Sequence, residues 1–162
     1  MVFTGTYEHR IDSKKRLAIP SEIRGQIQAE EGSNQGAAGI LYLYVTLGEG
    51  QALCLYTEAG FEQRAEELDH SELDPEQLLT YERLLFSLAR RVEIDKQGRV
   101  RLPEQLLAMA KFDTEVVLIG VKDHLEIRDR QTWKEHVASA LETYPGISMN
   151  PRRAMKSTQA HQ

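Results

Sequence analysis

The chain has 162 residues, of which 41% are hydrophobic and 28% are charged, proportions that favour one globular unit. Its net charge of −5 argues against a generally basic nucleic-acid binder. A single cysteine excludes an internal disulfide, no apolar run approaches the ~20 residues of a membrane span, and the first residues lack an export signal. We therefore expect a cytoplasmic protein.

The first 57 residues predict a hairpin, a helix and two further strands. Apolar and polar residues alternate through residues 7–11, a turn follows at residues 12–15, and Pro20 precedes a helix over residues 21–29. Residues 31–39 lack periodicity and are rich in glycine, so they predict a flexible loop. Strands are then expected over residues 40–46 and 52–56.

Residues 58–88 predict a helical connection. The stretch 75–91 carries a broad apolar stripe at helical spacing, with a proline at a permitted first position. Nine acidic residues and one base fall within residues 58–82. This segment is therefore locally acidic, whereas residues 90–101 are locally basic.

The decamer at residues 11–20 recurs at residues 94–103. Ile, Asp, Arg and Pro are repeated at a constant offset, for example between Ile11 and Ile94 and between Pro20 and Pro103. Strands at residues 115–120 and 125–128 repeat the earlier pair with a smaller offset, and the difference matches the loop at residues 31–39. The sequence therefore predicts two repeats that share one core, in an α+β, mainly β fold.

After the second repeat, residues 129–143 predict a helix. The stretch 145–162 carries three basic residues, no acidic residue and few apolar anchors. We expect this basic tail to be disordered.

The repeated turns carry a cluster of basic residues. A guanidinium fork matches guanine or a phosphate, and an ammonium acts as a point charge on a phosphate. The alternative is a solvated turn that happens to be basic, although duplication in register favours a binding role. The candidate contacts with double-stranded DNA are Lys14, Lys15, Arg16, Lys96 and Arg99.

The other polar residues of the turns have simpler explanations. Asp12 and Asp95 could serve as catalytic acids, but an aspartate at a turn usually accepts backbone N–H bonds. Gly98 supplies the positive φ that such a turn can require. The five histidines are scattered, and Cys54 between two leucines is expected to be buried and inert. We expect no metal, cofactor, small-molecule substrate or enzymatic activity.

These residues resemble the MraZ family of transcriptional regulators, which are built from two SpoVT-AbrB modules. The likeness covers roughly residues 3–143 and rests on Phe3, Gly5, Tyr7 and residues 12–20, then on residues 95–103, 115–120 and 126–133. Lys15 replaces the family's glycine in the first loop. Gln97 stands in the second loop where the first has Lys14.

The resemblance implies a pseudo-twofold swapped-hairpin barrel of the AbrB-like, double-psi type, with flanking helices. The expected organisation is a first module at residues 5–57, the connection at 58–88, a second module at 89–132, a helix at 133–144 and the tail. The resemblance also implies self-assembly into a ring of about eight or more subunits. It further implies that the protein acts at the nucleoid, where it binds repeated sequences in the promoter of the division and cell-wall gene cluster. The alternative is a protein-interaction assembly whose acidic helices dock a partner.

Overall fold

The computed structural model describes residues 1–32 and 39–146. The contacts divide the chain into two units, Met1–Asp129 and Arg130–Gln162. The expected loop begins inside a helix, because Glu31 is the last residue of α1 (Ser21–Glu31). Residues 33–38 of that loop, and nearly all of the expected tail, lie outside the described residues.

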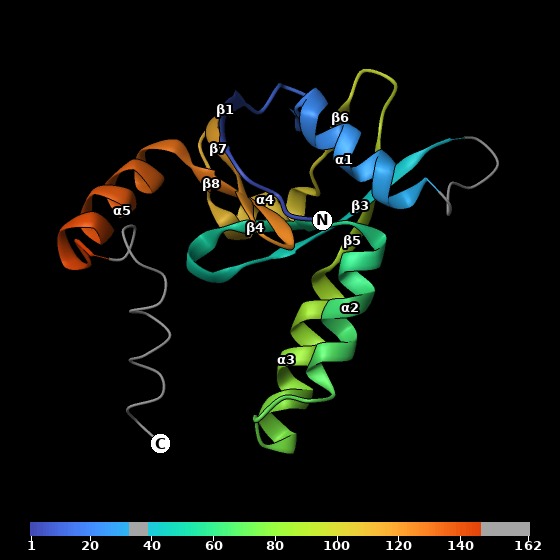
Figure 1. Ribbon diagram of the computed structural model, residues 1–162, viewed down its shortest axis with the longest axis vertical. Helices are drawn as coiled ribbons and strands as arrows, with labels where there is room; N and C mark the ends of the chain where they lie inside the picture. The colour runs from blue at the N-terminus through green and yellow to red at the C-terminus, as the bar shows by residue number, and fades with distance from the viewer. Residues whose placement is uncertain (33–38, 147–162) are drawn as a thin grey trace. The chain divides into compact units, whose positions relative to one another are not determined.

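In the described residues of the first unit, eight strands form one antiparallel sheet that is nearly a closed barrel (Figure 1). Its order is β1-β7-β8-β4-β3-β5-β6-β2. The edge strands β1 and β2 meet through the turn that joins them, where the Asp12 N–H donates to the Arg16 carbonyl at 3.0 Å. The strands are β1 (Thr6–Arg10), β2 (Arg16–Ala18), β3 (Leu41–Leu47), β4 (Leu53–Tyr56), β5 (Arg90–Ile94), β6 (Arg99–Arg101), β7 (Glu115–Val121) and β8 (His124–Asp129).

The two repeats are interleaved in this sheet. Strand β1 of the first repeat pairs with β7 of the second, and β5 of the second pairs with β3 of the first. Strands β2 and β6 pair with each other, as do β4 and β8. The predicted α+β, mainly β fold with swapped hairpins from two repeats is therefore confirmed.

The pairing registers locate the extra residues of the first repeat. Leu17 lies opposite Val100, an offset of 83, whereas Thr46 and Ile119, which lie opposite Cys54 and Glu126, are 73 apart. Ten extra residues therefore fall between β2 and β3. The eleventh falls in the turn between β3 and β4, which holds a short 3-10 helix, η1 (Glu49–Gln51). The sequence prediction had placed all of them in one loop.

A single apolar core fills the barrel. Leu17 and Val100 face each other across β2 and β6 with no exposed surface, and each repeat contributes further fully buried leucines. Burying one such side chain stabilises the fold by about 1.5–3 kcal/mol. Neither repeat could assemble this core alone, because the strands alternate between the two.

Helices cover the barrel or project from it. α1 and α4 (Glu104–Ala110) follow β2 and β6; α1 buries Ile23 and Ile27, and α4 buries Leu106 and Ala110. α2 (Glu58–Leu68) and α3 (Pro75–Leu88) lie side by side and run away from the strands (Figure 1), joined by an edge-to-face contact of Phe61 with Phe86 at 5.7 Å. One side of α3 therefore stays uncovered in the single chain.

The second unit contains α5 (Arg130–Thr143), a helix with no buried residue. Within it, the Gln131 amide donates to Glu135 at 3.0 Å and Trp133 stacks on His136. Among the described residues of both units, no helix combines the length and apolar character needed to span a bilayer.

Candidate nucleic-acid interface

The first repeated turn is built around the carboxylate of Asp12. Its Oδ1 accepts the backbone N–H groups of Lys14 and Arg16, both at 2.9 Å, and its carbonyl accepts the N–H of Lys15 at 3.0 Å. An aspartate that collects backbone donors in this way fixes the turn without needing a partner from outside. The structural role expected of Asp12 therefore accounts for all of these bonds.

The second turn repeats this geometry. Asp95 Oδ1 accepts the N–H groups of Gln97 at 2.9 Å and Arg99 at 3.0 Å, and the Gly98 N–H donates to the Asp95 carbonyl at 2.9 Å. Lys15 and Gly98 occupy the same repeat position and both have positive φ, 63° and 78°. The first turn therefore contains a lysine in a conformation that favours glycine.

Each turn is fastened to the strand of the other repeat. The Ile19 N–H donates to the Gly98 carbonyl at 2.9 Å, and the equivalent Leu102 N–H donates to the Lys15 carbonyl at 2.8 Å. The short ladder of β2 and β6 lies between these two bonds. The two turns are therefore held at opposite ends of one rigid element.

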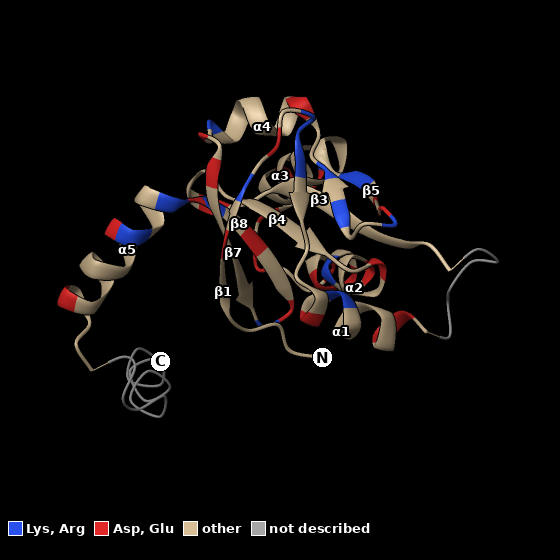
Figure 2. Cartoon of the chain, turned by 90° about the horizontal axis from the view of Figure 1, so that it is seen from above, with Lys and Arg blue, Asp and Glu red and all other residues tan. Residues whose placement is uncertain are grey.

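The ladder of β2 and β6 presents a basic face. Arg16 pairs with Arg101 and Ala18 pairs with Arg99, while Leu17 and Val100 on the other face are buried. Since alternate residues of a strand share a face, Arg16, Arg99 and Arg101 all lie on the side away from the core. We call these three residues the basic face; Figure 2 shows the neighbouring β5 to be basic too, whereas α2 is acidic.

Like charges stand directly opposite each other on the basic face. A pair such as Arg16 and Arg101 destabilises a ladder, by roughly the 0.2–1 kcal/mol that opposite charges would contribute there. A polyanion bound across the pair would remove this repulsion. The arrangement is therefore better suited to holding a duplex backbone than to stabilising the isolated fold.

Each turn aspartate forms an ion pair with the arginine of its own repeat, and the Arg16 Nε–H also donates a hydrogen bond to Asp12. Arg16 Nε lies 2.8 Å from Asp12 Oδ2, and Arg99 Nε lies 3.5 Å from Asp95 Oδ2, with each arginine side chain 27% exposed. In the described part of the chain, the two terminal nitrogens of Arg16 bond to no other residue, whereas Arg99 also donates to Gln97. The Arg16 fork is therefore oriented yet still available to a ligand.

The structure places the predicted residues at the two ends of the basic face. Lys14, Lys15 and Lys96 are exposed in the turns, and Arg16 and Arg99 lie on the ladder. Arg101 was not among the predicted contacts, although its alternation with Arg99 could have indicated it. The sequence also did not indicate that Arg24 packs on the second turn: its Nε donates to the Ile19 carbonyl at 3.1 Å, and its guanidinium lies against Gly98.

Opposite substitutions at the shared repeat position should change stability in opposite directions. Lys15→Gly should raise the free energy of unfolding by about 1–2 kcal/mol, because it removes a side chain from a left-handed conformation. Gly98→Ala should lower it by a similar amount, because the new Cβ would lie 2.6 Å from Arg24 Cζ at positive φ. Urea unfolding measures both changes, and equal signs would contradict this account of the turns.

The charge of Asp12 should contribute to stability at neutral pH and not in acid. The Arg16 backbone N–H, with smaller contributions from the Arg16 side chain and the Lys14 N–H, lowers the pKa of Asp12. The charged form therefore favours the folded state above pH 3.8, and the effect is lost as the pH falls through the lowered folded-state pKa. Asp12→Asn should thus destabilise at pH 7 more than at pH 3 in urea unfolding; an equal loss at both would contradict it.

The fold and the basic face together define a class of proteins. In this class, one chain forms a barrel from two interleaved repeats, and the turns of the two repeats flank a basic face. The sequence model of the family described as "MraZ protein, putative antitoxin-like" matches residues 2–80 and 85–144. A transcriptional regulator MraZ of Finegoldia magna is 35% identical over 147 residues, which cover 91% of this chain and 94% of that protein. The chain belongs to the MraZ family of transcriptional regulators.

Proposed function

We propose that the protein is a sequence-specific DNA-binding regulator whose basic face and adjoining turns contact the duplex. The observation that carries this proposal is the ladder of β2 and β6, where three arginines lie on one exposed face between two lysine-bearing turns. Arginine forks can read guanine in the major groove, while the exposed Lys14, Lys15 and Lys96 neutralise phosphates. The membership of a family of transcriptional regulators supports the same role.

One subunit offers few cations, so we propose that the protein acts as a ring of several copies on repeated promoter sites. The exposed apolar side chains of α3 support such assembly: Leu79, Leu84 and Phe86 are 45%, 57% and 41% exposed. Apolar side chains this exposed on one helix mark an interaction surface. Linked copies would gain affinity through effective concentration wherever the DNA repeats match the subunit spacing.

The family resemblance supports a finer proposal. The regulated genes would be those of the division and cell-wall cluster, and the protein would act in the cytoplasm, at the nucleoid. The contacts that we propose for this DNA are Lys14, Lys15, Arg16, Lys96, Arg99 and Arg101, with Asp12, Asp95 and Gly98 shaping the turns.

This function can be tested by letting the purified full chain select the fragments that it binds from the organism's own genome. We expect enrichment of fragments that carry a short repeated sequence, including promoter DNA of that cluster. Affinity for the enriched fragment should fall steeply with salt, with a logarithmic slope of about −0.9 for each phosphate contacted. Recovery of random fragments with no shared sequence would contradict sequence-specific regulation.

A further inference from the structure

A second group of chemically active side chains lies on β4 and β8, away from the basic face. Cys54 on β4 and Glu126 on β8 are direct partners in the ladder, and His124 lies two residues before Glu126, hence on the same face. One sulfur, one nitrogen and one oxygen from these three residues all lie within 4.8 Å of one another. The other face of both strands enters the barrel core, so the backbone beneath the group is fixed.

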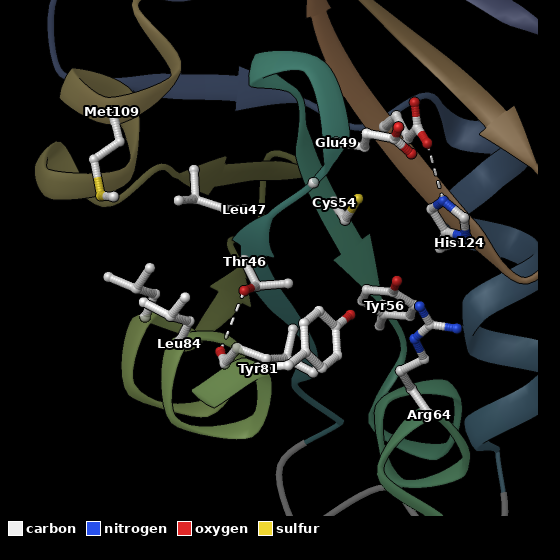
Figure 3. A pocket seen from close by; sticks show the side chains of 14 residues that line it. Thr46, Leu47, Glu49, Cys54, Tyr56, Arg64, Tyr81, Leu84, Met109 and His124 are labelled. Atoms are coloured by element: carbon white, nitrogen blue, oxygen red, sulfur yellow. Dashed lines mark hydrogen bonds and ion pairs between the residues drawn. The ribbon is translucent and has the colours of Figure 1, made fainter. Parts of the chain in front are cut away.

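The group lies in the wall of a cavity of about 700 Å³ (Figure 3). Cys54 is 6% exposed, and the side chains of His124 and Glu126 are 17% and 15% exposed. Figure 3 shows Cys54 and His124 on the two neighbouring strands, with Glu49 beside them. Ligating side chains are thus shielded from bulk water yet reachable through an open space.

The surrounding residues orient the group. His124 Nδ1 lies 2.7 Å from Asp123 Oδ1, which leaves Nε2 on the inner side, 3.2 Å from Glu126 Oε1. Glu126 Oε2 accepts from Arg128 Nε at 2.8 Å. A carboxylate on the outer nitrogen of a histidine and a hydrogen bond to a ligating carboxylate are the usual supports of metal ligands.

Two further features suit a metal ion. The ring of Tyr56 stacks on His124 at 5.2 Å and limits how the imidazole can turn. A Cβ at Gly48 would lie 2.5 Å from Cys54 Sγ, so this glycine leaves the sulfur its space. The combination of thiolate, imidazole and carboxylate selects zinc and similar divalent ions over magnesium or calcium.

We propose that Cys54 Sγ, His124 Nε2 and Glu126 Oε1 bind a zinc-class divalent cation. Donors in a tetrahedral zinc site lie about 3.3–3.8 Å apart, given metal–ligand distances of about 2.0–2.3 Å, so small side-chain rotations would close the present arrangement. Glu49, which lines the same cavity, or a water supplies the fourth ligand. Because Cys54 belongs to the first repeat and Glu126 to the second, the ion would crosslink the two repeats.

Cobalt(II) is the probe for this site, and the untagged full chain is the protein used. After treatment with a chelator, the chain should bind one equivalent of Co²⁺, with a thiolate charge-transfer band in the near ultraviolet and intense visible bands of tetrahedral cobalt. Cys54 is the chain's single cysteine, so a thiolate band assigns the ligand directly. Zn²⁺ should displace Co²⁺, and at a hundredfold excess over its Kd it should raise the Tm by about 5–10 °C.

Matched variants separate the site from other histidines. Cys54→Ser should abolish the charge-transfer band, and His124→Gln should weaken Co²⁺ binding at least tenfold. His70→Gln, an exposed residue beyond α2, should change neither. If Cys54→Ser fails to fold, His124→Gln with the Tm shift decides the question. Absence of a thiolate band, or a zinc-induced Tm shift that persists in His124→Gln, would mean that the group is only a hydrogen-bonded cluster and overturn the proposal.

Discussion

Arg16→Ala is expected to lower affinity for operator DNA by two orders of magnitude or more. Arg16 is held by Asp12 through Nε while its terminal nitrogens stay available, and one bidentate contact with a base contributes about 1–3 kcal/mol. Each additional subunit that engages the same duplex multiplies the loss. Gel shift and fluorescence anisotropy with a selected genomic fragment, at fixed salt, measure the change.

Arg10→Ala provides the matched control for Arg16. Arg10 lies on β1, pairs with Glu115 at 3.2 Å and is 71% exposed, so its loss removes the same charge at a residue outside the basic face. Affinity should change less than threefold in this variant, while light scattering should show both variants unchanged in mass. If Arg16→Ala bound DNA as tightly as Arg10→Ala did, the basic face would not be the DNA contact.

Leu84→Glu is expected to dissociate the proposed assembly. Burial of a leucine side chain stabilises a contact by about 1.5–3 kcal/mol, and burial of an unpaired carboxylate opposes it further. The glutamate should therefore weaken subunit association at least a hundredfold, which sedimentation velocity would report as a shift towards the single chain. Affinity for repeated DNA should fall as well, because only one subunit could then bind.

Leu141→Glu is the control for this change. Leu141 is similarly exposed, at 52%, but lies on α5 in the other unit of the chain. Its replacement should leave the sedimentation coefficient unchanged. An undiminished assembly in Leu84→Glu would show that α3 is not a subunit contact, whereas the DNA proposal would still be decided by Arg16.

The repeat and its shared core could be predicted because short patterns in the sequence indicate both. The constant spacing of Ile, Asp, Arg and Pro identified the two turns, and alternation assigned Leu17 and Val100 to the core. The positive φ expected of Gly98 is also present. Each of these features is set by residues that are close together in the sequence, so the sequence of one chain is enough to predict it.

The remaining features depend on pairing between distant segments. Arg101 joins the basic face only because β6 lies in register with β2, and Cys54 meets His124 only because β4 lies beside β8. Spacing in sequence shows neither contact, so the scattered histidines gave no indication that Cys54, His124 and Glu126 lie together. The extent to which α3 is uncovered likewise depends on how α2 packs against it.

Joining both repeats in one chain gives the subunit a polarity. If each repeat were a separate, identical chain, the two chains would form a dimer that presents the same turn twice, related by a twofold axis. Such a dimer would favour palindromic DNA. Here one turn carries Lys14 and Lys15 and stands beside Arg101, whereas the other carries Gln97 and Gly98. If this face binds DNA as proposed, such a subunit would distinguish the two directions along a duplex, and a row of copies related by rotation would read sites that run head to tail.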